Sequence, residues 1–149
     1  ITKSYNKSSV LIEYGGDHVR KVPMSLETSE KYDIKNNEYA FKVCRIEPEN
    51  NIHLILEAFK RKPKVDIIIV GNWDYSTYGQ KLKKKYSTFE NLKLLDPIYD
   101  QVTLDELRSN CALYIHGHSV GGTNPSLVEA MNLGLCIVSF KIDYNIETT

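Results

Sequence analysis

Short apolar blocks separated by polar, glycine-containing segments run along the chain, and this alternation predicts a series of strands. Residues 65–70 are rich in valine and isoleucine, which is typical of a strand buried on both faces of a parallel sheet. A short strand is also expected at residues 9–14, where a Gly15-Gly16-Asp17 turn ends it. The blocks with the length and composition of strands in the rest of the chain are residues 37–44, 65–70, 91–95, 111–115 and 135–140.

Segments between these blocks predict helices. Residues 52–59 have a broad apolar face, and residues 75–86 form a lysine-rich helix with a solvated face. Thr103 with a glutamate three residues later has the pattern of a capping box, so a helix is expected to begin there. A helix over residues 125–134 has Asn124 as its cap, Pro125 in its first turn and Gly134 at its end.

Strands therefore alternate with helices from residue 37 onward. This order predicts one α/β domain with a doubly wound, Rossmann-like parallel sheet. In such sheets ligands bind beyond the carboxyl ends of the strands. The loops expected at that edge are residues 45–51, 71–75, 96–100 and 116–124.

The loop at residues 116–124 has the most specific sequence. It follows an apolar block, contains Gly121 and Gly122, and opens the helix that begins at Pro125. The N–H groups of a first helical turn lack partners within the helix and favour anions, and glycines let a ligand approach the backbone. On geometry alone, an ordinary strand-to-helix turn is an equally good interpretation.

Composition narrows the class of protein. The 149 residues carry 19 basic and 19 acidic side chains, and this zero formal net charge argues against nucleic-acid binding through bulk charge. Cys44, Cys111 and Cys136 lie far apart in apolar blocks, so we expect buried free thiols in a reducing compartment. No apolar run approaches the roughly 18 residues of a membrane-spanning helix. A start at Ile1 without a secretory signal is expected for a fragment of a longer chain.

Residues 121–131, Gly-Gly-Thr-Asn-Pro-Ser-Leu-Val-Glu-Ala-Met, resemble the donor-binding signature of retaining GT-B glycosyltransferases that use nucleotide sugars. The common form of that signature is Glu-Gly-Phe-Gly, a short spacer, and Leu-Glu-Ala-Met. The variant most similar to this chain, His-Ser-Val-Gly-Gly-Thr-Asn-Pro-Ser-Leu-Leu-Glu-Ala-Met, is that of bacterial capsule and O-antigen rhamnosyltransferases. Residues 118–131 match it at almost every position. The Gly15-Gly16-Asp17 turn also resembles the start of such donor domains.

The resemblance implies roles for three residues. Glu129 would accept hydrogen bonds from ribose hydroxyls, Arg45 would grip the diphosphate with two N–H groups, and the backbone at Ile98 would contact the base. The plain alternatives are a solvated helix glutamate and a surface salt bridge at Arg45. Further hydroxyl and backbone donors at the helix start are offered by Thr123, Asn124 and Ser126.

Two positions depart from the common pattern of the family. Asn50 stands where a lysine usually helps to neutralise the diphosphate, although the rhamnosyltransferase-like group shares this asparagine. Gly121 stands where a first glutamate usually contacts the transferred sugar, and a small residue there is compatible with a deoxy sugar.

His116 and His118 are the remaining candidates in this loop. Either imidazole could contact the diphosphate or the donor sugar, and a structural role is the plain alternative. No carboxylate or thiol cluster with matching spacing accompanies them, as a metal site would require. The class of transferase implied by the resemblance needs no metal ion and no cofactor besides its nucleotide-sugar substrate.

The resemblance thus implies a glycosyltransferase that transfers a hexosyl or rhamnosyl group with retention, from a donor such as dTDP-rhamnose, in bacterial polysaccharide biosynthesis. Residues 1–149 would be the donor domain of a two-domain enzyme, without its N-terminal acceptor domain and closing helices. Such a piece is expected to be inactive alone and to bind nucleotide weakly. The acceptor would be a saccharide or a lipid-linked saccharide.

The full-length protein would then work in the cytoplasm, at the inner face of the plasma membrane. A non-catalytic nucleotide- or phosphate-binding module of the same fold is the alternative. An oxidoreductase-type dinucleotide domain is the least favoured interpretation, because no Gly-x-Gly-x-x-Gly follows an early strand.

Overall fold

A computed structural model describes residues 5, 6, 8, 10 and 12–149. Its centre is one sheet of five strands in the order β3-β2-β1-β4-β5, and every neighbouring pair is parallel. The doubly wound parallel sheet is therefore confirmed, with a strand inside each apolar block expected from residue 37 onward. The strands are β1 Tyr39–Val43, β2 Asp66–Val70, β3 Leu92–Leu95, β4 Leu113–His116 and β5 Ile137–Ser139.

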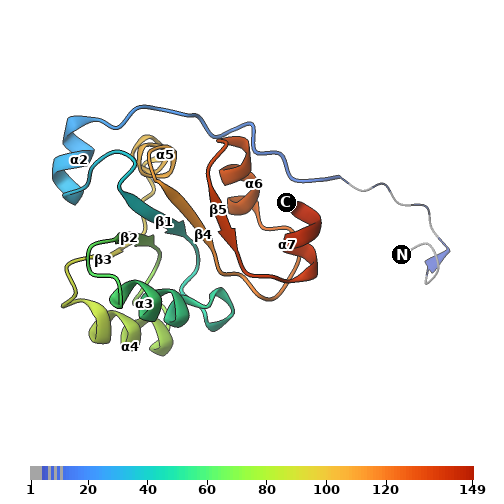
Figure 1. Cartoon of the computed structure of the whole chain (residues 1–149). Coiled ribbons are helices and arrows are strands. Elements are labelled where there is room, and N and C mark those ends of the chain that lie inside the picture. Colours follow the sequence, from blue (N-terminus) through green and yellow to red (C-terminus); the bar gives the residue numbers. More distant parts are fainter. Residues whose placement is uncertain (1–4, 7, 9, 11) are drawn as a thin grey trace.

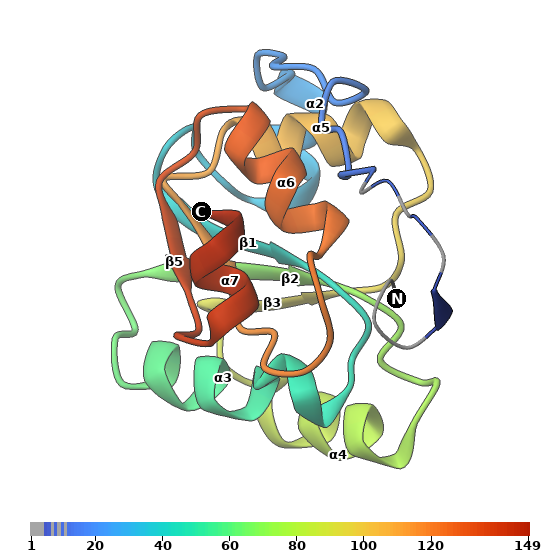
Figure 2. The same cartoon turned by 90° about the vertical axis from the view of Figure 1, so that its right-hand side faces the viewer.

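Helices cover both faces of this sheet (Figures 1 and 2). Helices α3 and α4 lie on one face, and α2, α5 and α6 lie on the other (Figure 2). A 3-10 turn, η1, spans Pro48–Asn50 within the loop after β1. The helices are α2 Leu26–Tyr32, α3 Ile52–Lys60, α4 Thr77–Tyr86, α5 Gln101–Ser109, α6 Pro125–Asn132 and α7 Asp143–Thr148. None of those in the described part of the chain is long and apolar enough to cross a membrane.

Strand β2 shows how the sheet separates two apolar cores. Ile67 and Ile69 pack in the core beneath α3 and α4, and the alternate residues Ile68 and Val70 pack in the core beneath α5 and α6. Side chains on a strand alternate between faces, so a strand covered on both sides is apolar at nearly every position. This is the physical reason for the valine- and isoleucine-rich block.

The order of the strands places a crevice beside β1. The chain runs from β1 to β2 and β3 on one side, then crosses to β4 on the other side of β1. The loops after β1 and β4 leave the same edge of the sheet in opposite directions, which is where doubly wound folds bind ligands. Residues 44–51 and 117–124 form these two loops.

The structure corrects some details of the elements expected. Ser9 and Leu11 of the expected strand at residues 9–14 lie outside the described residues, and residues 10 and 12–14 belong to no strand. Val10 and Ile12 are 88% and 89% exposed, so no sheet covers them here. Helix α5 begins at Gln101, and its cap is Asp100, whose carboxylate accepts a hydrogen bond from the N–H of Thr103 at 2.8 Å.

The end of the chain and the burial of the cysteines also differ from the expectation. Helix α7 was not expected from the sequence. It is held by Asn145, whose buried side-chain amide donates to the carbonyls of His118 and Phe140. All three cysteines are free, but only Cys111 is buried, whereas Cys44 is half-buried and Cys136 is exposed.

Candidate functional site

A cavity of about 350 Å³ lies in the crevice between β1 and β4. Its walls come from the end of β1, from η1, from the loop after β4 and from helices α5 and α6. It brings together six of the residues that the sequence singled out, which are Arg45, Asn50, His118, Asn124, Ser126 and Glu129. Those residues span more than eighty positions of the chain, so the fold and not local sequence gathers them.

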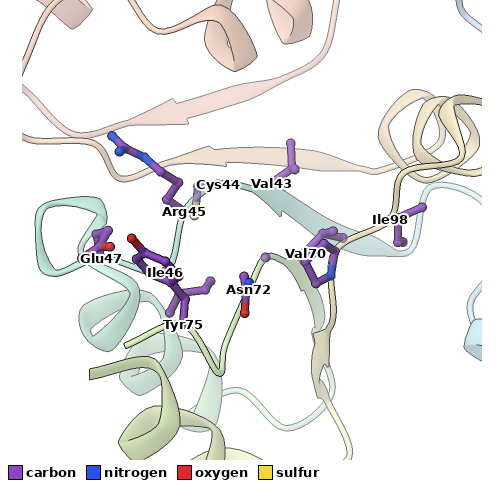
Figure 3. A pocket seen from close by; sticks show the side chains of 11 residues that line it. Val43, Cys44, Arg45, Ile46, Glu47, Val70, Asn72, Tyr75 and Ile98 are labelled. Atoms are coloured by element: carbon purple, nitrogen blue, oxygen red, sulfur yellow. The ribbon is translucent and has the colours of Figure 1, made fainter. Parts of the chain in front are cut away.

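A second hollow, of about 300 Å³, adjoins the first, since Val43, Cys44 and Arg45 line both. Figure 3 shows it: Val70 and Ile98 form one side and Tyr75 and Asn72 another. Ile98 therefore lies in the hollow beside the crevice. The largely apolar lining suits a planar ring system.

Arg45 follows β1 directly and is exposed at the carboxyl edge of the sheet. Its guanidinium makes no ion pair with any carboxylate of the described residues, so a surface salt bridge does not explain it. Figure 3 shows the side chain extending from the strand end, away from Asn72 and Tyr75. An arginine in this position can grip an anion with two parallel N–H groups.

Glu129 is held from two sides. Its Oε2 lies 2.8 Å from Nη2 of Arg108, and its Oε1 lies 3.0 Å from Nε2 of His18. The Glu129 side chain is only 16% exposed, and that of Arg108 is 3% exposed. The glutamate is thus an oriented, half-buried carboxylate and not a solvated helix residue.

Arg108 is a site residue that the sequence interpretation missed. It lies on α5, where Leu104 and Leu107 share its apolar face, and Cys111, just beyond the end of the helix, joins the same core. A charged residue at such a position has to find a partner when it is buried. The spacing indicates a buried charge but not its partner, because only the fold brings Glu129 to Arg108.

His18 reaches Glu129 because the turn before it packs closely on α6. A Cβ atom at Gly16 would lie 2.9 Å from the carbonyl oxygen of Val128, so only glycine allows this approach. Beyond His18 the segment is tied to α5, where the Ser109 hydroxyl donates to the Arg20 carbonyl at 3.1 Å. The Gly-Gly-Asp turn thus lies against the helix that carries Glu129.

His118 is buried in the wall of the cavity, with Nδ1 3.2 Å from Oδ1 of Asn50. The Asn50 amide nitrogen donates to the carbonyl of Arg45 at 3.0 Å. Burial lowers the pKa of His118, the Lys42 and Arg45 charges act in the same direction, and Glu49 opposes them. The ring is therefore neutral at pH 7. Both polar atoms of the Asn50 side chain are already hydrogen-bonded within the protein, so Asn50 presents no free polar group to a ligand.

The start of α6 differs from the sequence expectation. The Asn124 side chain accepts hydrogen bonds from the N–H of Ser126 at 3.0 Å and from its hydroxyl at 2.7 Å. The next amide, that of Leu127, donates to the Asn124 carbonyl. These first-turn donors are thus satisfied by the cap itself, so the positive end of the helix dipole, and not free N–H groups, faces the cavity.

Besides Ile98, which lines the adjoining hollow, three predicted residues lie outside the cavity. Gly122 and Thr123 face a separate hollow beside α7, where the Thr123 hydroxyl lies 3.5 Å from that of Thr148. Gly121, with φ of +113°, lies next to the His118 ring. The loop turns outward after His118, and this turn carries these residues away from Arg45 and Glu129.

His116 is buried and separate from the cavity. Its Nε2 has no partner among the described residues, and burial lowers its pKa to about 4. Within the described part of the chain, no three His, Cys, Asp or Glu side chains are grouped closely enough to hold a metal ion.

Comparisons with known proteins identify the family of the chain and proteins of similar fold. The sequence model of the family described as "Glycosyl transferases group 1" matches residues 25–148. No curated protein matches the sequence significantly. Among solved structures, the chain is similar to sucrose-phosphate synthase from Thermosynechococcus elongatus, with a TM-score of 0.62, 14% identity, and coverage of 85% of this chain and 33% of that one.

Two further structures show the same fold. A UDP-GlcNAc 2-epimerase from Neisseria meningitidis, bound to UDP-GlcNAc, gives a TM-score of 0.61 at 17% identity and covers 82% of this chain and 33% of that one. The C-terminal domain of a group 1 glycosyl transferase from Francisella tularensis gives 0.60 at 14% identity, covering 85% and 70%. The chain spans about a third of the first two proteins. Because the family model matches most of the sequence, the chain belongs to the group 1 family of glycosyl transferases.

Proposed function

We propose that the cavity binds a nucleoside diphosphate sugar and that the chain is the donor-binding domain of a glycosyltransferase. The observation that carries the proposal is that Arg45 and Glu129, from β1 and α6, line one cavity at the topological switch point. An unpaired guanidinium and an oriented carboxylate are the groups that a diphosphate and a ribose require.

The dimensions and lining of the site support this arrangement. The apolar hollow that contains Ile98 adjoins the crevice on the side of Arg45, and it would take the base. Glu129, held by Arg108 and His18, would accept hydrogen bonds from the ribose hydroxyls or, in a dTDP donor, from the 3′-hydroxyl of the deoxyribose. The structurally similar epimerase is bound to UDP-GlcNAc, a ligand of this chemical class.

In the proposed reaction the diphosphate is the leaving group, and negative charge develops on it as the bond to the sugar breaks. Arg45 and the positive end of the α6 dipole would stabilise that charge, which is the main catalytic task of such a domain. Because Asn50 replaces a lysine and is bound to Arg45 and His118, Arg45 is the principal cation of this wall.

The finer assignment is a dTDP-rhamnose donor used with retention in bacterial polysaccharide biosynthesis. It is supported by the match of residues 118–131 to the rhamnosyltransferase form of the signature. A saccharide or lipid-linked acceptor would be bound by a further domain, at the inner face of the plasma membrane. The alternative is a nucleotide-binding module whose affinity does not depend on the sugar.

Calorimetric titration with matched pairs separates these functions. The pairs are UDP and UDP-glucose, GDP and GDP-mannose, and dTDP and dTDP-rhamnose. The proposal predicts that one sugar-bearing ligand binds more tightly than its own diphosphate, with the dTDP pair strongest. Equal affinity within every pair would favour the binding module, and absence of binding by all six ligands would contradict a nucleotide site.

A further inference from the structure

The two departures from the common family pattern meet at one side chain. Asn50 contacts Nδ1 of His118 at 3.2 Å, and a Cβ atom at Gly121 would lie 3.2 Å from Nε2 of the same ring. Residues 50 and 121 are far apart in the sequence, and yet they touch opposite nitrogens of one imidazole. His118 therefore links the two substitutions physically.

The hydrogen bonds of the Asn50 amide determine the tautomer of His118, that is, which ring nitrogen carries the proton. Its nitrogen donates to the Arg45 carbonyl at 3.0 Å, so its oxygen must face His118. Exchanging the two amide atoms would bring two carbonyl oxygens together. Nδ1 consequently carries the proton and donates to Asn50, which leaves Nε2 as an acceptor. The Val120 backbone also lies near the ring and raises the pKa of His118 against the larger effect of burial, but within the described residues the hydrogen bond that meets geometric criteria at this ring is the one to Asn50.

The backbone around the ring is fixed as firmly as the ring itself. The Ser119 N–H donates to the Glu49 carbonyl at 2.9 Å, and the Asn51 side chain donates to the Gly117 carbonyl at 2.8 Å. On the other side, Asn145 of α7 donates to the His118 carbonyl at 3.0 Å. The imidazole is thus held in place before any ligand arrives.

The sequence left two partners open for His118, the diphosphate and the donor sugar. An acceptor nitrogen in this wall excludes the diphosphate. Phosphate oxygens of a nucleoside diphosphate are acceptors at pH 7 and offer no proton to Nε2. The groups next to a diphosphate that do donate are hydroxyls: those of the ribose, which the proposed site assigns to Glu129, and those of the attached sugar. Apart from Nε2 of His118 and the neighbours of Gly121 in the chain, no described atom lies within 4 Å of the Cβ position at Gly121, so the glycine leaves room on this side for a hydroxyl.

We infer that His118 is a sugar-recognition residue, whose Nε2 accepts a hydrogen bond from a hydroxyl of the transferred sugar, and that Asn50 is the positioning residue that fixes the required tautomer. This inference rests on the proposed nucleotide-sugar site and deepens it. The pair Asn50 and His118 would thus serve the sugar, and Arg45 alone the diphosphate.

The first test needs no ligand. Long-range proton–nitrogen spectra of the 149-residue chain, with His118 assigned by comparison with His118→Gln, report the protonation of each ring nitrogen. We expect Nδ1 protonated and Nε2 bare in the wild type. Asn50→Asp keeps the acceptor oxygen but its charge raises the pKa of His118, so the same tautomer is expected there at a pH above that raised pKa. Asn50→Leu removes the acceptor oxygen, and the proton should then move to Nε2, toward Val120. A proton on Nε2 in the wild type would overturn the inference.

The second test measures the ratio of the dissociation constants of a diphosphate and its sugar-bearing form, using the tightest pair above. His118→Phe and Asn50→Leu should lower the preference for the sugar-bearing form by about threefold to tenfold, roughly the effect of one hydrogen bond, and leave the diphosphate affinity within about twofold. Asn50→Asp should keep the preference even where charge weakens both ligands. His53→Gln, on α3 and bound to Tyr78, is the control.

The two proposals fail in distinguishable ways. If the wild type binds a pair and both variants keep its sugar preference, His118 does not contact the sugar and the nucleotide site stands. If both variants weaken the diphosphate and its sugar form equally, His118 acts on the wall as a whole and the inference is wrong. If the wild type binds none of the ligands, the nucleotide site and the sugar contact are both refuted.

Discussion

At the scale of single residues, the carboxylate of Glu129 is the most constrained group in the site. Arg108 and His18 each bind one of its oxygens. Each carboxylate oxygen has a second lone pair, so hydroxyls of a ribose can still bind. The same arrangement makes Glu129 a structural partner of a buried arginine. Substitutions at this position must therefore separate recognition from folding.

Replacement of Glu129 by glutamine and by alanine should have different consequences. Glu129→Ala leaves Arg108 buried with only Asp105 nearby, and removal of one partner of a buried pair costs about 3–5 kcal/mol. Glu129→Gln keeps an acceptor for Arg108, so the loss of unfolding free energy should be clearly smaller. Both variants should weaken nucleotide binding. Urea unfolding and titration measure the two effects, and unchanged nucleotide affinity in Glu129→Gln would remove this residue from the site.

Arg45 is expected to act on the phosphates alone. Arg45→Ala should weaken a nucleoside diphosphate by roughly tenfold to a hundredfold, the loss expected for charge-assisted hydrogen bonds, and should leave the bare nucleoside nearly unaffected. The unfolding free energy should change little, because the side chain is exposed and makes no ion pair among the described residues. Arg61→Ala, at the far end of α3, is the matched control. An equal loss for nucleoside and diphosphate would show that Arg45 acts through the fold.

His116 should make the fold sensitive to acid. Burial lowers its pKa from 6.5 to about 4, with Lys42 and His118 acting in the same direction. Between these values the unfolded chain binds more protons than the folded chain, so the stability that His116 contributes is complete above pH 6.5 and is lost as pH falls toward 4. The contribution is about 3 kcal/mol at most.

Urea unfolding at pH 7 and pH 4.5 tests this sign. His116→Gln should lose less stability than the wild type over that interval, because groups common to both proteins cancel in the comparison. Parallel pH profiles for the two proteins would mean that His116 does not titrate in this range.

At the scale of elements, sequence patterns predicted the strands and α6 because local signals and tertiary packing agree there. Strand β2 is apolar on both faces and is buried on both. Asn124, Pro125 and Gly134 mark the limits of α6, and Gly134 adopts the expected left-handed conformation with φ of +67°. An element can be predicted from sequence where its local signals and its tertiary packing favour the same structure.

Other elements were misjudged where tertiary contacts override local signals. Glu106 does not close a capping box on Thr103. Instead it accepts a hydrogen bond from the Ser25 hydroxyl at 2.7 Å, which ties α5 to the start of α2. Helix α7 has few strong helix formers and depends on Asn145. Arg45 and Glu129 were recognisable from sequence, whereas the partners Arg108 and His18 were not, since only the fold brings them to Glu129.

The close packing of the Gly15-Gly16 turn on α6 can be tested by adding one methyl group. Gly16→Ala places a Cβ atom 2.9 Å from the Val128 carbonyl, and the turn has to shift, at a cost of about 1–3 kcal/mol. The shift should also move His18 away from Glu129. Gly122→Ala is the control, because nothing lies within 4 Å of its Cβ position. Equal unfolding free energies of the two variants would contradict the packing described.

At the scale of the whole molecule, the sheet topology explains why the site exists. The two hollows share Val43, Cys44 and Arg45 at the end of the central strand, where the chain changes direction across the sheet. A base in one hollow and a ribose beside Glu129 in the other would place the diphosphate near Arg45. Neither hollow is encoded by one segment, which is why sequence alone located the residues but not the cavity.

Chemical-shift mapping is the most direct test of this arrangement. The backbone amide signals of the isotope-labelled chain are followed during titration with dTDP-rhamnose, and with UDP-glucose in parallel. The account predicts that the largest shifts fall on residues of both walls, at Arg45, His118, Ser126 and Glu129, and extend to Ile98. Absence of shifts at saturating ligand, or shifts confined to the opposite edge of the sheet, would contradict a nucleotide-sugar site between β1 and β4.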